Sequence, residues 1–254
     1  MTGRVARDAS VESPGTRRTE TTIRRPPPPA RMYVVVNAAQ SVDGKLSTRR
    51  REQLRISGEE DFDRVDRIRA AADAVLVGVG TVLADDPHLT LDEEARRVER
   101  LRNGRPGDPA RVVVDSTGRT PTDARILDDA ATTYLLVSAA ATPERREELS
   151  AAGAEVVVAG EERVDLDEAA SALEDAGVDR LMVEGGGEVI YSCFAAGIVD
   201  ELQVYVGSLV VGGRDAPTLV DGDGFLEAFP RLDLTGIERL DDGVVLSYDV
   251  GERS

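Results

Sequence analysis

The sequence has 254 residues, with 48 acidic against 31 basic side chains and a net charge of −17. Nucleic-acid binding depends on Lys and Arg side chains that displace counterions from phosphates, so no nucleic acid is expected as a partner. Cys193 and His88 are the single cysteine and histidine, which excludes a disulfide framework and a Cys/His zinc site, and no metal is expected.

Lys45 is the single lysine, so nearly all the basic residues are arginines. Acidic, lysine-poor surfaces suit proteins that work in concentrated salt, where screening shortens the range of charge repulsion. This pattern predicts a halophilic, cytoplasmic protein, and an acidic mesophilic protein from a GC-rich genome is the alternative. No apolar run reaches the about 18 residues that a membrane span needs, so no membrane association is expected.

The first 30 residues differ in composition from the rest of the chain. They contain six arginines, three acidic residues, a run of four prolines and almost no large apolar side chains. Such a segment cannot bury enough apolar surface to offset the entropy lost on ordering, so a disordered tail is expected at 1–30. Because Met32 begins the first strand-like run, an over-extended gene start is a second interpretation. Residues 31–254 are expected to form one domain.

From Met32 onward, short apolar runs alternate with segments of helical periodicity. Buried strands interleaved with helices indicate an α/β fold, in which a mostly parallel sheet carries helices on its faces. The expected strands are Met32–Asn37, Ala74–Val79, Arg111–Asp115, Thr132–Val137, Glu155–Val158, Arg180–Glu184, Glu201–Val206 and Val244–Val250. The expected helices are Glu59–Ala71, Pro143–Ala152, Leu166–Ala176 and Gly187–Ala196.

Two strand ends have the form of ligand-binding corners. In a parallel α/β sheet, ligands collect where strands end and helices begin, because the free N–H groups of a first helical turn attract anions. In the first corner, a buried strand leads into Gly80, Thr81 and Asp85. In the second, a strand ends in Glu184 and three glycines open a helix. A buried carboxylate is costly to desolvate, so Glu184 is either paired structurally or holds hydroxyl or amine groups of a ligand.

A third segment, 37–46, leaves the first strand and turns at Asp43-Gly44. We expect Ser41 and Asp43 to bond the local backbone of this turn. Lys45 stands apart, because lysine supplies a compact ammonium that can reach a phosphate or donate a proton. Either that chemistry or chance explains why the chain keeps this lysine.

Six motifs occur in the order and spacing of the riboflavin-pathway reductases, which the chain resembles over residues 32–250, most closely in the archaeal members. They are SVDGK at 41–45, VGVGTVLADDPHLT at 77–90, RVVVDS at 111–116, EGGG at 184–187, GIVDE at 197–201 and GGRDAPT at 212–218. The resemblance implies a dihydrofolate-reductase-like fold, a homodimer and NADPH as cofactor, with NADH as a second possibility. The activity it implies is reduction of the ribosylamino group of 2,5-diamino-6-(ribosylamino)-4(3H)-pyrimidinone 5′-phosphate to a ribitylamino group.

The resemblance also implies roles for individual residues. Those implied to contact the cofactor are Gly80, Thr81, Asp85, Val158, Gly185, Gly186, Gly187, Glu188 and Val189. Those implied to contact the nucleotide-like substrate are Asn37, Arg69, Leu89 and Glu184. Lys45 and Glu184 are the candidate catalytic residues, and a bound water is the alternative proton donor.

The chain departs from the family pattern at two places. Residues 91–109 form a longer, charged segment than is typical, and Asp92 stands where bacterial relatives carry a substrate-binding arginine. Phosphate recognition is therefore expected from Arg69 or Lys45. Two alternative functions stay open, a pterin reductase of the dihydrofolate-reductase type and a non-catalytic NADP-binding module.

Overall fold

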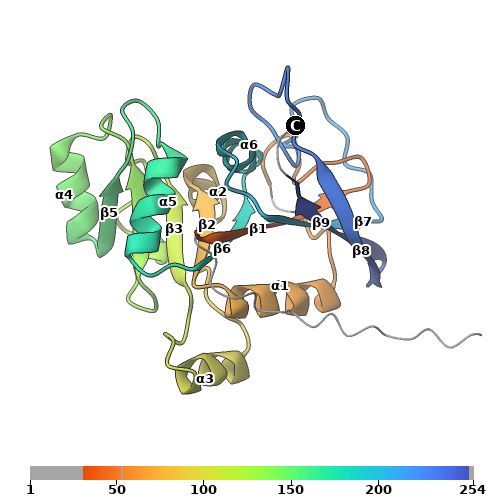
Figure 1. The fold of residues 1–254 in the computed structure, drawn as a ribbon, viewed down its shortest axis with the longest axis horizontal. Coiled ribbons are helices and arrows are strands. Elements are labelled where there is room, and N and C mark those ends of the chain that lie inside the picture. Colours follow the sequence, from red (N-terminus) through yellow and green to blue (C-terminus); the bar gives the residue numbers. More distant parts are fainter. Residues whose placement is uncertain (1–30, 53, 252–254) are drawn as a thin grey trace, which may run out of the picture.

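The computed structural model describes residues 31–52 and 54–251, so the tail expected at 1–30 lies outside the described residues. One nine-stranded sheet runs through this part of the chain in the order β5-β4-β3-β2-β6-β1-β7-β9-β8 (Figure 1). The strands from β5 to β7 in this order are parallel, and β9 and β8 continue the sheet antiparallel at one edge. The strands are β1 (Tyr33–Ser41), β2 (Ala74–Gly78), β3 (Ala110–Val114), β4 (Thr133–Val137), β5 (Ala154–Val158), β6 (Arg180–Gly185), β7 (Glu201–Gly207), β8 (Leu232–Leu240) and β9 (Gly243–Val250).

Helices cover both faces of the sheet, as Figure 1 shows. On one face, α5 and α6 bury residues such as Leu173 and Ile190 in the larger core. On the other face, α1, α2 and α4 contribute Ile68, Val82 and Leu149 to a second core. The helices are α1 (Glu59–Ala71), α2 (Val79–Asp85), α3 (Glu94–Arg102), α4 (Pro143–Ala151), α5 (Leu166–Asp175) and α6 (Gly187–Ala196), with a 3-10 turn η1 (Arg125–Leu127). The predicted α/β fold, a mostly parallel sheet between helical layers, is confirmed.

Local signals account for several helix ends. The Thr142 side chain accepts a hydrogen bond from the N–H of Arg145, and Pro143 occupies the first turn of α4. Asp165 caps α5, since its side chain accepts from the N–H groups of Asp167 and Glu168. Gly197 ends α6 in the left-handed conformation, with φ 74°. None of the helices in the described ranges is long and apolar enough to cross a membrane.

Four elements differ from the sequence-based expectation. β1 continues to Ser41 because its register with β7 holds as far as Gly207, which places Asn37 inside the strand. Helix α2 begins at Val79, which was expected to be the last residue of a strand. The charged segment 91–109 contains helix α3. β8 was not expected, since nearly all of its residues are exposed and it has no clear apolar alternation.

Candidate active site

Three motif-bearing segments meet at the edge of the sheet where the parallel strands end. β6 pairs with β2 on one side and with β1 on the other, all in parallel. The carboxyl ends of neighbouring parallel strands lie at the same edge, so Gly78, Gly185 and Ser41 end their strands there. The two corners predicted from the sequence are therefore brought together, with the third segment beside them.

Thr81 lies against the triple-glycine turn. A Cβ placed on Gly186 would lie 3.9 Å from the Thr81 hydroxyl oxygen, and one on Gly78 would lie 2.7 Å from Val189 Cγ2. Gly186 has φ 83° and ψ 110°, a conformation that favours glycine. A Cβ would meet nothing within 4 Å at Gly80, which is exposed, or at Gly185, which is buried, so neither position is crowded and Gly80 leaves bare backbone that a ligand can approach.

The first turn of α6 faces this corner. Because the first N–H groups of a helix have no intrahelical acceptor and lie at its positive end, they attract anionic groups. Val189 is buried in the larger core and holds the turn against the sheet, while Glu188 is exposed. A glycine turn leading into a helix N-terminus, with exposed backbone at Gly80 and an uncrowded Gly185, fits the pyrophosphate of a dinucleotide.

The third segment reaches the glycine turn through the loop after β7. The Lys45 backbone forms a β-bridge with Thr218, and the Lys45 ammonium donates to the carbonyl of Ala216 at 3.1 Å. A Cβ on Gly187 would lie 2.4 Å from the Thr218 carbonyl oxygen, so this loop packs tightly on the glycine turn. The Asp221 N–H donates to the Gly187 carbonyl at 3.1 Å and closes the contact. Lys45 therefore lies on a segment that is continuous with the site.

Ser41 and Asp43 hold the turn of this third segment. The Ser41 hydroxyl accepts from the Lys45 N–H at 2.9 Å and bonds the Asp43 carboxylate at 2.6 Å. Besides a bond with its own backbone, as expected, the Asp43 carboxylate accepts from the N–H groups of Val211 and Gly212, at 3.0 and 2.7 Å. The Ser41 hydrogen bond, followed by these two, lowers the pKa of Asp43 to about 2.

Glu184 is paired with Arg69. The Arg69 guanidinium donates to both Glu184 oxygens, with Nη2 to Oε2 at 2.6 Å, and also to the carbonyl of Thr90 at 3.3 Å. Burial alone would lower the pKa of Arg69, but the charge and hydrogen bonds of Glu184 outweigh burial and raise it. Leu89 precedes Thr90 and is buried with φ 53°, a strained conformation for a bulky residue. The structure thus joins Glu184, Arg69 and Leu89.

Asn37 lies beside Glu184 on the same face of the sheet. Val36 of β1 is in register with Val183 of β6, so Asn37 and Glu184 are the next residues on their strands. Asn37 is 5% exposed, and its side-chain oxygen accepts from Arg64 of α1 at 2.8 Å.

Arg64 links Asn37 to two further polar side chains, of which Asp61 is buried and Gln203 half-buried. Its guanidinium also donates to Gln203 Oε1 at 2.6 Å and to the Asp61 carboxylate at 2.8 Å. No sequence motif points to Arg64, Asp61 or Gln203 as residues of the site. An arginine inside a polar helix carries no sequence signal that separates it from a solvent-exposed one.

Helix α1, which carries both arginines, is held at its two ends. At its start, the Asp241 carboxylate accepts from the N–H groups of Gly58 and Asp61, both at 3.1 Å. At its end, buried Arg100 of α3 donates to the carbonyls of Ala70 and Ala72, at 2.8 and 2.7 Å. The charged segment 91–109 therefore supplies a brace for α1.

Two predicted cofactor contacts lie farther from the glycine turn. Val158 ends β5, and β4 and β3 separate it from β2 at the same sheet edge, a span of about 14 Å at normal strand spacing. Asp85 ends α2, where the next residue, Asp86, is left-handed with φ 41°. The glycine turn follows β6, one strand beyond β2, so a cofactor that reaches from it to Val158 would span about 19 Å.

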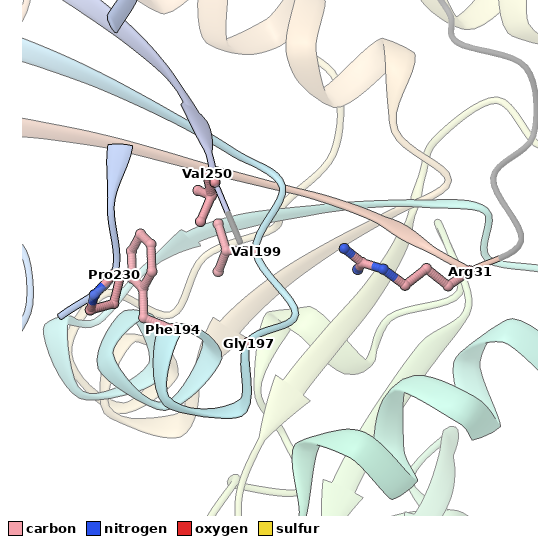
Figure 2. Close-up of a pocket in the computed structure, with 7 residues that line it drawn as sticks. Arg31, Phe194, Gly197, Val199, Pro230 and Val250 are labelled. Atoms are coloured by element: carbon pink, nitrogen blue, oxygen red, sulfur yellow. The ribbon is translucent and has the colours of Figure 1, made fainter. Parts of the chain in front are cut away.

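A separate pocket lies at the opposite edge of the sheet, where the parallel strands begin (Figure 2). The Arg31 guanidinium on its wall donates to the Asp200 carboxylate at 2.5 Å and to the Ile198 carbonyl at 3.2 Å, so its charge is already paired. The lining contains no acid or nucleophile, and it consists of Arg31, Phe194, Gly197, Val199, Pro230, Val250 and Gly251. Reactive groups gather instead at the carboxyl edge.

Comparison with known proteins finds two archaeal relatives that match along nearly their whole length. The 2,5-diamino-6-ribosylamino-4(3H)-pyrimidinone 5′-phosphate reductase of Archaeoglobus fulgidus is 48% identical over 217 residues, which cover 85% of this chain and 97% of that protein. The reductase of the same name from Methanothermobacter thermautotrophicus is 47% identical over 223 residues, which cover 87% of this chain and 99% of that protein.

Solved structures share the fold. A pyrimidine reductase-like protein of Corynebacterium diphtheriae superposes with a TM-score of 0.77 at 20% identity, over 87% of this chain and 92% of that one. The riboflavin biosynthesis reductase of Saccharomyces cerevisiae superposes with a TM-score of 0.64 at 21% identity, over 87% of this chain and 90% of that one. The family model described as the RibD C-terminal domain matches residues 32–246. The chain therefore belongs to the RibD C-terminal domain family.

Proposed function

We propose that this protein is the oxidoreductase that reduces the ribosylamino group of 2,5-diamino-6-(ribosylamino)-4(3H)-pyrimidinone 5′-phosphate to a ribitylamino group in riboflavin biosynthesis, with NADPH as reductant. The observation that carries the proposal is the meeting of the Thr81 corner and the 185–187 glycine turn beside the Arg69–Glu184 pair. Relatives that match along almost their whole length are named as this reductase.

The cofactor would lie along the carboxyl edge of the sheet. Backbone N–H groups at the start of α6 would bind its pyrophosphate, and the exposed Gly80 would let the backbone approach it. Thr81 and Asp85 would contact the same molecule from α2, and Val158 would contact its far end. NADPH supplies a hydride when bound, and the protein supplies orientation and exclusion of water.

The substrate would lie over the polar groups that face α1. Glu184 keeps lone pairs beyond those used by Arg69, so it can accept hydrogen bonds from pyrimidine amines or ribose hydroxyls. Arg69, Asn37 and Leu89 line the same region, and either Arg69 or Lys45 would contact the phosphate. Arg69 offers only the donors that Glu184 and Thr90 leave free, which favours Lys45 for that contact.

Reduction of a ring-opened imine leaves an amine nitrogen that needs a proton. Lys45 and Glu184 are the candidate residues. Both Glu184 oxygens already accept from Arg69, which suits this carboxylate to binding and orientation. The Lys45 ammonium can donate a proton, and its segment is joined by a β-bridge to the loop that packs on the glycine turn.

A homodimer belongs to the proposal. The edge strand β8 exposes an apolar row, in which Leu234 is 52% and Ile237 is 67% exposed. Their partners Tyr248 and Leu246 are two residues apart on β9, so both side chains lie on one face despite the bulge at Leu234/Gly236. An uncovered apolar edge of this kind favours pairing with a second copy.

The first experiment is a turnover assay with two variants. In high salt, the wild type should oxidise NADPH only when the ribosylamino pyrimidinone phosphate is present, as followed by nicotinamide absorbance. Thr81→Ala should raise KM for NADPH about tenfold, because it removes one cofactor hydrogen bond. Glu184→Gln should lower kcat/KM for the pyrimidine by about 10- to 100-fold, because the site loses an acceptor built to bind it.

Glu144→Gln, an exposed change in α4, serves as the control and should leave both constants unchanged. Thermal unfolding of each variant separates loss of fold from loss of function. A protein that quenches NADPH fluorescence without turnover would be a binding module and would refute the proposal. Turnover with dihydrofolate in place of the pyrimidine would identify a pterin reductase.

A further inference from the structure

The side-chain amide of Asn37 is held in one orientation, and its N–H groups donate to no group among the described residues. Arginine only donates hydrogen bonds, so the atom of Asn37 that faces Arg64 must be its oxygen. Among residues 31–52 and 54–251, no group accepts a hydrogen bond from the Asn37 amide nitrogen. Asn37 is 5% exposed, but its amide nitrogen is not one of the fully buried, unpartnered polar atoms among the described residues, so a ligand or water can accept from its donor hydrogens.

The direction of this donor follows from the neighbours of Arg64. The same guanidinium bonds Asn37 on β1 and Gln203 on β7, which are in register with each other. The Asn37 oxygen therefore faces the β7 side. Its nitrogen faces the other way, toward β6, where Glu184 is the next residue along the row.

Asp61 and Gln203 fix Arg64 in this position. The buried Asp61 carboxylate accepts from Arg64 Nε at 2.8 Å, and Gln203 in turn donates from Nε2 to Glu201 at 2.6 Å. Each of these groups has only one arrangement that satisfies its partners, so Arg64 cannot rotate without leaving a buried polar atom unpaired. The Asn37 amide is held by the same network.

We infer that Arg64 is a positioning residue that presents the Asn37 amide nitrogen as a hydrogen-bond donor beside the Glu184 acceptor, so that the pair selects a ring carbonyl and its neighbouring N–H. This inference rests on the proposed function. A 4(3H)-pyrimidinone carries a carbonyl oxygen at C4 and a hydrogen on the adjacent N3. The Asn37 amide nitrogen can donate to the carbonyl oxygen, and the free lone pairs of Glu184 can accept from the N3–H.

Asn37→Asp tests this assignment while the network stays intact. The new carboxylate still accepts from Arg64, so the fold and the melting temperature should be maintained. The outward-facing group changes from a donor to an acceptor, which should raise KM for the pyrimidinone substrate by about 10- to 100-fold with a much smaller change in kcat. Asn37→Ala removes the donor without adding charge and should give a rise of similar size, which separates loss of the donor from repulsion of the substrate phosphate.

Arg64→Met tests the positioning role. Without Arg64, the Asn37 amide would present its oxygen to the substrate as often as its nitrogen, so KM for the pyrimidinone should rise. Once Asn37 is already alanine, loss of Arg64 should have no further effect, so the double variant Asn37→Ala/Arg64→Met should bind the substrate no worse than Asn37→Ala alone. Arg67→Met is the matched control, since Arg67 is an exposed arginine on the same helix that pairs only with Asp63. If Arg64→Met unfolds because Asp61 loses its partner, the Asn37→Asp result decides the question.

The outcomes separate this inference from the proposed function. An unchanged KM in Asn37→Asp and Asn37→Ala would show that Asn37 merely satisfies Arg64, and it would overturn the inference while turnover persists. Additive losses in the double variant would overturn the positioning role of Arg64. A wild type that never turns over the pyrimidinone phosphate would overturn both the function and the inference.

Discussion

Gly186 sets the shape of the candidate cofactor turn through its backbone conformation. Its backbone lies at φ 83° and ψ 110°, a conformation that is strained for any residue with a side chain. Space is not the obstacle, because a Cβ would lie 3.9 Å from Thr81 Oγ1. Gly186→Ala should therefore lower the free energy of unfolding by about 1–3 kcal/mol and raise KM for NADPH, because relief of the strain moves the first turn of α6. Urea unfolding and steady-state kinetics measure the two effects.

Gly107→Ala is the control for this prediction. Gly107 does not have positive φ, and its Cβ would meet only ordinary contacts at 3.9 Å or more. Wild-type stability and kinetics are expected for it. A Gly186→Ala protein that behaves like this control would show that the turn conformation contributes neither to stability nor to cofactor binding.

The position of a single residue in the site could be predicted where a local motif marks it, but not where its contacts join distant parts of the chain. The triple glycine and Glu184 stand in one short motif at the end of an apolar run, so their place in a strand-to-helix corner could be read directly. Arg64 reaches Asn37 across 27 positions and Gln203 across 139. No periodicity records such a contact, and only the packing of α1 on the sheet makes it.

Among the elements, α1 has the clearest long-range support. Arg100 of α3 is 3% exposed and donates to the Ala70 and Ala72 carbonyls at the end of α1 and to Pro106. Burial, followed by the charge of Arg105, lowers the pKa of Arg100 to about 10, so it stays charged at neutral pH. The end of α1, where Arg69 lies, is thus fixed by a charged donor.

Arg100→Met should destabilise the protein by roughly 3 kcal/mol, because buried carbonyls lose charged donors. Arg102→Met is its matched control, an exposed arginine on the same helix, and should change stability little. Chemical denaturation compares the two. Equal stabilities would mean that α3 does not brace α1.

Elements differ in how far sequence patterns reveal them. Five-residue apolar runs such as β2 and β4 are buried completely or nearly so, and they were expected within one residue of their observed bounds. β8 lacks the alternation of a half-buried strand because almost all of its residues are exposed, and it pairs only with β9. Helix α3 was hidden because its buried face is made of arginine carbon chains and paired charges, as at Arg100.

At the scale of the whole molecule, charge and the exposed sheet edge act in opposite directions. A net charge of −17 makes two copies repel each other, and salt screens that repulsion. The apolar row of β8 favours association. High salt should therefore favour the proposed homodimer, and the proposed binding of anionic ligands would rely on backbone N–H groups, Lys45 and other local donors.

Ile237→Asp should convert the protein to a monomer. Ile237 is the most exposed member of the apolar row, at 67%, and a buried charge at an interface is costly without a partner. Light scattering in high salt should give twice the 27.2 kDa chain mass for the wild type and the single mass for the variant. Glu238→Arg, on the opposite face of β8, should remain a dimer. A wild type that stays monomeric at every salt concentration would show that β8 is a free edge, blunted by its bulge and its charged residues rather than by a second copy.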